Sequence, residues 1–192
     1  DQARAVQESH LRAFWELLKD KGTTFAVRDG KLHAGEYVVN GNYELPDKVK
    51  ELFGGAATIF MGERRVSTNV MTPDGARAVG TVLDGPPRDA LFRDGKPYRG
   101  EAVILGVPYF TAYDPIRNAG GEVIGALFVG VKKGDFYAGY ERLKRGSILI
   151  ALLVGGVFGL ISILLVGRLL SPLKAMVEKL RRIPDDESRV TD

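Results

Sequence analysis

The chain has 192 residues, enough for one ordinary domain and a further segment. It contains no cysteine, which excludes disulfides and thiolate metal sites, and its two histidines, His10 and His33, are too few for a metal centre. The formal net charge is +3 and the pI about 9.1. Because the basic residues gather at the two edges of one long apolar segment, contact with lipid headgroups explains them better than nucleic acid does.

Residues 1–22 are predicted to form an N-terminal helix. Apolar side chains recur at helical spacing from Val6 to Leu18 and cover much of the helix surface. Gly22 supplies the stop signal. A helix this apolar can pack on a sheet and on a second copy at once, so we assign it as a stalk or dimerisation helix.

Residues 23–131 are predicted to form a domain of short strands with little helix. A helix is expected at 46–53, where Pro46 opens the first turn, and another at 88–92. Residues 72–97 read as a looped arm rich in proline. The connections between strands are short, so neighbouring strands must be antiparallel. The predicted strands are 23–27, 36–39, 56–61, 65–70, 98–105, 109–116 and 122–131.

A second helical pattern, residues 132–145, leads directly into an apolar segment, residues 146–167, that carries no charge. At 1.5 Å per residue this segment spans about 33 Å, close to the hydrocarbon thickness of a bilayer. We interpret it as a transmembrane helix. The alternative, a fully buried core helix, would need a large protein around it. The richer basic cluster follows the segment, which favours a cytoplasmic location for the C-terminal side.

Residues 168–192 begin with Ser171-Pro172, a good N-cap and first turn of a helix. From Leu173 to Ile183, apolar residues recur at a spacing near 3.5, which is typical of a coiled coil or bundle. One helix cannot bury such a seam alone, so a partner chain is implied. An amphipathic helix lying on the membrane is the alternative.

Three long stretches carry a resemblance to a known family: residues 57–84, which include RVSTNV, residues 95–118, GKPYRGEAVILGVPYFTAYDPIRN, and residues 120–131, GGEVIGALFVGV. They resemble bacterial sensory receptors with a single Cache domain, of the Cache 3/Cache 2 fusion type. Residues 170–183 resemble the first helix of a HAMP relay. The resemblance implies an α+β fold, a PAS-like antiparallel sheet with a long N-terminal helix, and a parallel homodimer. It also implies a periplasmic sensor of small metabolites, often organic acids, in a methyl-accepting chemotaxis protein or a sensor kinase.

In PAS-like sheets the ligand pocket lies between the sheet and the looped arm, here residues 62–97. On the strand 65–70, regular alternation puts Arg65, Ser67 and Asn69 on one face and Thr68 on the other. We expect the first three to face the ligand, because an arginine fork binds a carboxylate through two charge-assisted hydrogen bonds. The alternative is that Arg65 is a solvated hairpin residue and Asn69 a turn former.

A polar and aromatic stripe follows on the strand 109–116, where Tyr109, Thr111 and Tyr113 share a face. Tyr98 begins the neighbouring strand and could meet this stripe. Arg77 lies in the arm and could close over a ligand. The alternatives are a cross-strand aromatic cluster for the tyrosines and an ordinary surface position for Arg77.

The sequence contains no catalytic constellation: it lacks a phosphate-binding glycine loop with lysine, a His-Glu-x-x-His pair and a nucleophile elbow. We therefore expect no enzyme in this fragment, no cofactor and no metal. The expected function is extracytoplasmic sensing of a small molecule, with a carboxylate favoured, as the input half of a chemotaxis receptor. The alternatives are the input half of a histidine kinase or nucleotide cyclase, and an interaction domain that binds no ligand.

The expected location is the bacterial inner membrane, with residues 1–145 periplasmic and 168–192 cytoplasmic. The expected partners are a small-molecule ligand, the membrane, a second copy of the chain and downstream cytoplasmic signalling proteins, but no nucleic acid.

Overall fold

The computed structural model describes residues 2–136, 152, 154–159 and 161–165. The chain divides into two units, Asp1–Ala138 and Gly139–Asp192, and the fold described below belongs to the first. In the second unit, residues 154–159 and 161–165 are helical. None of the helices within the described part of the chain is both long and apolar enough to cross a membrane. Most of the predicted 132–145 helix, much of the 146–167 span and the whole HAMP-like segment lie outside the described residues.

The first unit combines helices with antiparallel strands, in agreement with the predicted α+β class. Its helices are α1 (Gln2–Lys19), α2 (Glu44–Phe53), the short α3 (Gly85–Arg88) and a π-helical turn η1 (Asp89–Arg93). Its strands are β1 (Phe25–Arg28), β2 (Lys31–Ala34), β3 (Tyr37–Val38), β4 (Ala56–Met61), β5 (Arg64–Thr68), β6 (Tyr98–Ile104), β7 (Val107–Arg117) and β8 (Val123–Lys132).

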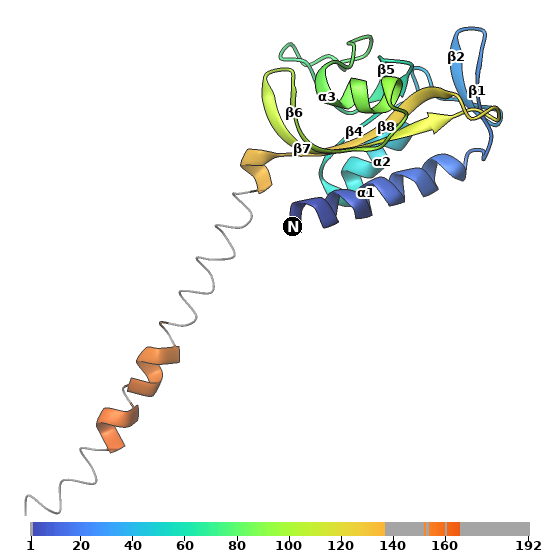
Figure 1. Ribbon diagram of the computed structural model, residues 1–192. Helices are drawn as coiled ribbons and strands as arrows, with labels where there is room; N and C mark the ends of the chain where they lie inside the picture. The colour runs from blue at the N-terminus through green and yellow to red at the C-terminus, as the bar shows by residue number, and fades with distance from the viewer. Residues whose placement is uncertain (1, 137–151, 153, 160, 166–192) are drawn as a thin grey trace, which may run out of the picture. The chain divides into compact units, whose positions relative to one another are not determined.

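Five strands form the main sheet in the order β5-β4-β8-β7-β6, and every pairing is antiparallel. Helices α1 and α2 lie against one face, and the arm with α3 and η1 lies against the other (Figure 1). We call these the helix face and the arm face. Strands β1 to β3 form a separate small sheet at the end of α1. The prediction missed β2, a four-residue strand between two turns.

Each face of the main sheet buries its own apolar cluster. On the helix face, Leu11, Phe14 and Leu18 of α1 are at most 1% exposed and pack with Ile59 and Leu127 of the sheet. The stripe predicted for the N-terminal helix is therefore real, although it begins at Gln7 and Leu11, because Val6 is exposed. On the arm face, residues of the arm pack with rings of the sheet in a second cluster that includes Phe60, Ala78, Leu83, Leu91, Tyr113 and Phe128.

A β-bulge interrupts the hairpin of β4 and β5. Thr58 pairs with Thr68 and Ile59 with Ser67, but Phe60 pairs with Arg65, which leaves Val66 as the extra residue. A bulge inserts one residue on one strand, so the alternation of side chains reverses across it. Arg65 therefore follows Phe60 onto the arm face, whereas Ser67 follows Ile59 onto the helix face.

The arm is fastened along the free edge of β5. The backbone of Arg65 donates to the carbonyl of Thr81 (3.0 Å) and accepts from the amide of Gly80 (2.8 Å), and the amide of Leu83 donates to the carbonyl of Glu63 (2.8 Å). An isolated bridge between Arg64 and Val82 adds to this contact. The arm thus covers the Arg65 side chain, and its inner residues close the arm-face core.

Candidate functional site

Arg65 is a buried cation beneath the arm. The residue is 5% exposed, and its Nη1 atom donates to the hydroxyl of Thr81 at 2.6 Å. The guanidinium lies over the ring of Phe60, 5.3 Å from the centroid. Its Nε atom is buried without a hydrogen-bond partner, and no Asp or Glu of the described residues forms an ion pair with it. Burial lowers the pKa of Arg65, but arginine stays protonated at neutral pH. The site therefore holds one uncompensated positive charge.

Two tyrosines of β7, Tyr109 and Tyr113, lie on the same face of the sheet as Arg65. Tyr113 is 1% exposed and Tyr109 is 6% exposed, and burial raises the pKa of both hydroxyls. The Arg65 charge opposes that shift at both tyrosines, so both hydroxyls lie within its field. Asp84 acts in the other direction and adds a negative field at Tyr113. The arm face thus gathers a guanidinium and two buried hydroxyls, which are donors suited to an anion.

The polar stripe on β7 has the predicted alternation, because its register against β6 and β8 is regular from Tyr109 to Tyr113. The Tyr113 ring contacts Tyr98 edge-on, with centroids 6.0 Å apart. The hydroxyl of Tyr98 points along its own strand and donates to the carbonyl of Glu101 (2.9 Å). The hydroxyl of Thr111 donates to the carbonyl of Gly100 (3.0 Å), which ties it to the neighbouring strand.

The predicted common face of Arg65, Ser67 and Asn69 is wrong, and the bulge at Val66 is the reason. Ser67 lies on the helix side, where its hydroxyl donates to the carbonyl of Asn42. The Asn69 side chain is built into the backbone: its Oδ1 accepts from the amide of Ala57 (2.8 Å) and its Nδ2 donates to the carbonyl of Pro46 (2.7 Å). These contacts hold α2 against the sheet.

Arg77 fastens the arm to α2. Its two terminal nitrogens form a bidentate pair with Asp47 at 2.7 and 2.8 Å, and one of them also donates to the carbonyl of Thr68. The guanidinium lies over the Tyr43 ring, 4.4 Å from the centroid. Its charge is therefore already compensated, unlike that of Arg65.

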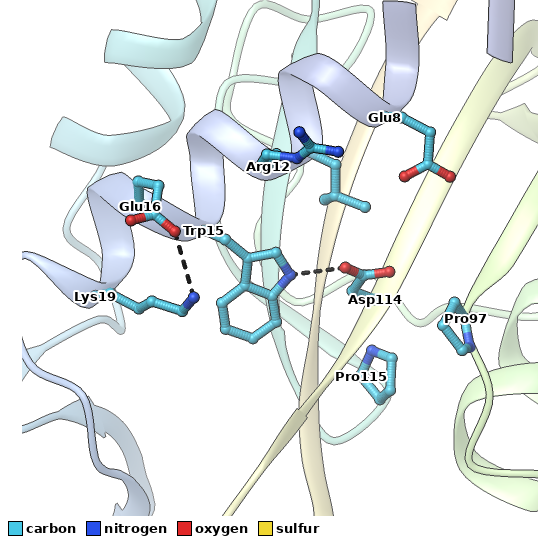
Figure 2. Close-up of a pocket in the computed structure, with 9 residues that line it drawn as sticks. Glu8, Arg12, Trp15, Glu16, Lys19, Pro97, Asp114 and Pro115 are labelled. Carbon is cyan, nitrogen blue, oxygen red and sulfur yellow. Dashed lines mark hydrogen bonds and ion pairs between the residues drawn. The ribbon is translucent and has the colours of Figure 1, made fainter. Parts of the chain in front are cut away.

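Among the cavities that border these elements in the described part of the chain, three lie beside Asn69, Thr111 or Asp114. One of about 300 Å³ lies where β4, β7 and β8 meet the end of α2, and Asn69 and Tyr109 are among its lining residues. One of about 190 Å³ lies between the start of α1 and the hairpin of β6 and β7, and Thr111 lines it. The third, about 450 Å³, is an open groove between α1 and β7 (Figure 2). Its lining residues are Glu8, Leu11, Arg12, Trp15, Glu16, Lys19, Pro97, Asp114 and Pro115.

A polar cluster borders that groove, and sequence reasoning missed its centre, Arg99. Figure 2 shows Trp15 of α1 turned toward Asp114 of β7, and the indole Nε1 donates to a carboxylate oxygen at 2.8 Å. The other oxygen of Asp114 accepts from Arg99 at 2.7 Å, and Arg99 also pairs with Glu8 of α1. No short-range signal could reveal this cluster, because Glu8 and Arg99 are 91 residues apart.

The described residues contain no group of three or more His, Asp or Glu side chains placed to hold a metal ion.

Comparison with known proteins tests the family resemblance of the chain. Residues 37–143 match the family described as Single cache domain 3. No curated protein matches the chain. Among solved structures, the E. coli DcuS sensor domain aligns with a TM-score of 0.46 and 15% identity, over 70% of this chain and 95% of that one. The family match spans more than half of the chain and confirms the resemblance to a single Cache domain. The chain belongs to the Single cache domain 3 family.

Proposed function

We propose that this chain is the input half of a transmembrane receptor that senses a small carboxylate outside the cytoplasm. The observation that carries the proposal is the buried guanidinium of Arg65, which has no carboxylate partner among the described residues. A buried ion without a counter-ion costs several kcal/mol. An anionic ligand would remove that cost, and the hydroxyls of Tyr109 and Tyr113 would add donors.

The charge pattern favours a ligand with one carboxylate. Arg65 supplies one positive charge, whereas Arg77 is neutralised by Asp47. A second carboxylate would also meet the negative field of Asp84. The side chains around Arg65 are largely apolar, and among them Phe60 and Phe128 are fully buried. A monocarboxylate with an apolar body fits this chemistry best.

The same proposal places residues 1–145 outside the cytoplasm, 146–167 in the inner membrane as a helix, and 168–192 in the cytoplasm as the start of a HAMP relay. The absence of charge from 146–167 supports this arrangement. The receptor acts as a homodimer through its N-terminal helices and passes its signal to cytoplasmic proteins. A chemotaxis receptor is the output we favour, with a histidine kinase or cyclase as the alternative, and the fragment itself performs no catalysis.

The route toward the membrane begins at the end of β8. Residues 133–136 continue β8 as a helix. Lys133 pairs with Glu101 of β6 at 2.5 Å, and Phe136 contacts Phe110 of β7 edge-on, with centroids 5.3 Å apart. The hairpin of β6 and β7 therefore touches the start of the outgoing helix, and a shift of the hairpin would reach it.

One observation favours a second function, an interaction domain without a ligand. Side chains fill the space between the sheet and the arm, where Leu91 and Phe128 have no exposed surface. Under the first proposal, by contrast, a ligand reaches Arg65 only by displacing part of the arm. The hydrogen bond between Arg65 and Thr81 then opens when the ligand binds.

The test is a thermal-shift titration of the purified chain with acetate, propionate, benzoate and succinate, compared with Arg65→Met. A ligand at one hundred times its dissociation constant adds about 2.7 kcal/mol to the free energy of unfolding. We expect stabilisation by a monocarboxylate that exceeds any by succinate and that Arg65→Met abolishes. Arg117→Met, which removes an exposed arginine bound to the carbonyls of Gly95 and Gly121, should leave the response intact. No response to any carboxylate would favour the interaction domain.

A further inference from the structure

Arg99 joins three elements of the fold, α1, β6 and β7, through one side chain. It is 14% exposed, its Nε and Nη2 atoms pair with the Glu8 carboxylate of α1, and its Nη2 atom donates to Asp114 of β7 at 2.7 Å. Its remaining nitrogen, Nη1, donates to the backbone carbonyls of Tyr98 (3.0 Å) and Tyr113 (2.5 Å). The guanidinium is therefore held by two strands and one helix together.

These contacts connect the two faces of the sheet. Tyr98 and Tyr113 are direct partners across β6 and β7, and their rings lie on the arm face beside the Arg65 site. The carbonyls of the same two residues hold Arg99, whose guanidinium meets Glu8 on the helix face. A displacement of the strand backbone at Tyr98 or Tyr113 moves the carbonyls that position Arg99. Hydrogen bonds weaken steeply as their geometry degrades, so a small displacement alters the contact with α1.

The contacts of Arg99 lead, through Asp114, to the only tryptophan of the chain, Trp15. Asp114 accepts from Arg99 with one oxygen and from Trp15 Nε1 with the other, at 2.7 and 2.8 Å. The indole also packs edge-on against Phe25, with centroids 5.8 Å apart. If Asp114 shifts, the indole loses or changes its hydrogen bond, and its fluorescence changes with it.

We infer that Arg99 is the positioning residue that transmits the state of the arm face to α1, and that Trp15 reports this transmission. The inference rests on the proposed function only in taking the arm face as the ligand side. In this role Arg99 acts through the carbonyls of Tyr98 and Tyr113 on one side and through Glu8 and Asp114 on the other. A merely structural clasp would stabilise α1 equally, whatever the state of the arm face.

The test needs no ligand, because Arg65→Met changes the arm face from within. We compare four versions of the 192-residue chain: the parent, Arg65→Met, Arg99→Met and the double variant. The readouts are Trp15 emission, excited where tyrosine does not absorb, and amide hydrogen exchange of α1. The expected result is that Arg65→Met shifts both readouts in the parent and that Arg99→Met abolishes the shift. In an Arg117→Met background the shift should persist, because in the parent Arg117 donates to the backbone carbonyls of Gly95 and Gly121.

Either of two results would overturn the inference: no shift in the parent background, or a shift of equal size in the Arg99→Met background. If Arg99→Met does not fold, Arg99→Lys takes its place, because lysine keeps the charge but lacks the planar fork that binds two partners at once. The carboxylate titration succeeds or fails independently of this comparison. Failure of the ligand proposal and failure of the proposed transmission through Arg99 can therefore be told apart.

Discussion

Replacement of Arg65 by methionine should stabilise the ligand-free protein while abolishing its ligand response. The buried ion costs roughly 4 kcal/mol as an unpaired charge. Its hydrogen bond to Thr81 returns about 2 kcal/mol, and its contact with Phe60 about 1 kcal/mol. The difference, about 1 kcal/mol, is the expected gain in the free energy of unfolding. Methionine leaves no new unpaired group, because the Thr81 hydroxyl also donates to the carbonyl of Ala78 at 2.8 Å.

The assay is thermal unfolding of both proteins without ligand, followed by the same measurement with benzoate. A gain of about 1 kcal/mol raises the unfolding midpoint by about 3–4 °C for a domain of this size. With benzoate, the parent's midpoint should rise and that of Arg65→Met should not. Arg117→Met is the matched control and should lower the midpoint slightly. A clear loss of stability in Arg65→Met would refute the reasoning, because the guanidinium would then be part of the structural core.

Three further expectations follow from particular contacts. Gly125→Ala should cost about 3 kcal/mol in urea unfolding, because a Cβ there would lie 2.2 Å from the backbone oxygen of Phe60. Asn69→Ala should cost about 2–4 kcal/mol in the same assay, because it leaves the buried amide of Ala57 without its acceptor and removes a donor from the carbonyl of Pro46. Arg99 holds the pKa of Glu8 below its usual value of 4.5, so this pair's stabilisation is full above pH 4.5 and is lost as the pH falls through the lowered pKa. Glu8→Gln should therefore reduce the loss of stability on acidification.

Each of these has a matched control. Gly134→Ala places its Cβ in open space and should change stability little. Asn118→Ala removes an exposed amide from a turn and should cost well under the buried amide's effect. Glu16→Gln removes an exposed carboxylate paired with Lys19 and should leave the acid response nearly unchanged. Equal effects for test and control in any pair would contradict the contact invoked for it.

Most of the main sheet could be predicted from the sequence because its strands are apolar, of ordinary length and separated by Gly, Pro or Asn. The hairpin of β4 and β5, and the strands β6 to β8, fall within a few residues of the predicted ranges. Strand β2 was missed because its period-2 pattern, with Leu32 and Ala34 buried, lasts only four residues. Helix α2 begins at Glu44 rather than at Pro46, so the proline occupies the third helical position.

The site was harder to predict because two of its determinants are not local. Alternation along β5 gives the correct face only up to the bulge, and nothing in RVSTNV marks Val66 as the extra residue. The regular strand β7 has no such break, and there the predicted stripe of Tyr109, Thr111 and Tyr113 has its expected alternation. Whether the charge of an arginine is compensated depends on residues distant in sequence. Arg77 pairs with Asp47, whereas Arg65 pairs with no carboxylate of the described residues.

Strand β8 lies in the middle of the main sheet although it comes last in the sequence of the domain. The β4–β5 and β6–β7 hairpins can each close locally, but in the hydrogen-bonded sheet they are joined only through β8, whose Val129 pairs with Ala57 on one side and with Ala112 on the other. Ala57 and Val129 are far apart in sequence, and such pairings are slow to form. During synthesis, the two halves of the sheet must therefore wait, half-built, until the residues immediately before the outgoing helix have been made. Completion of the domain thus coincides with the arrival of the apolar segment that follows it.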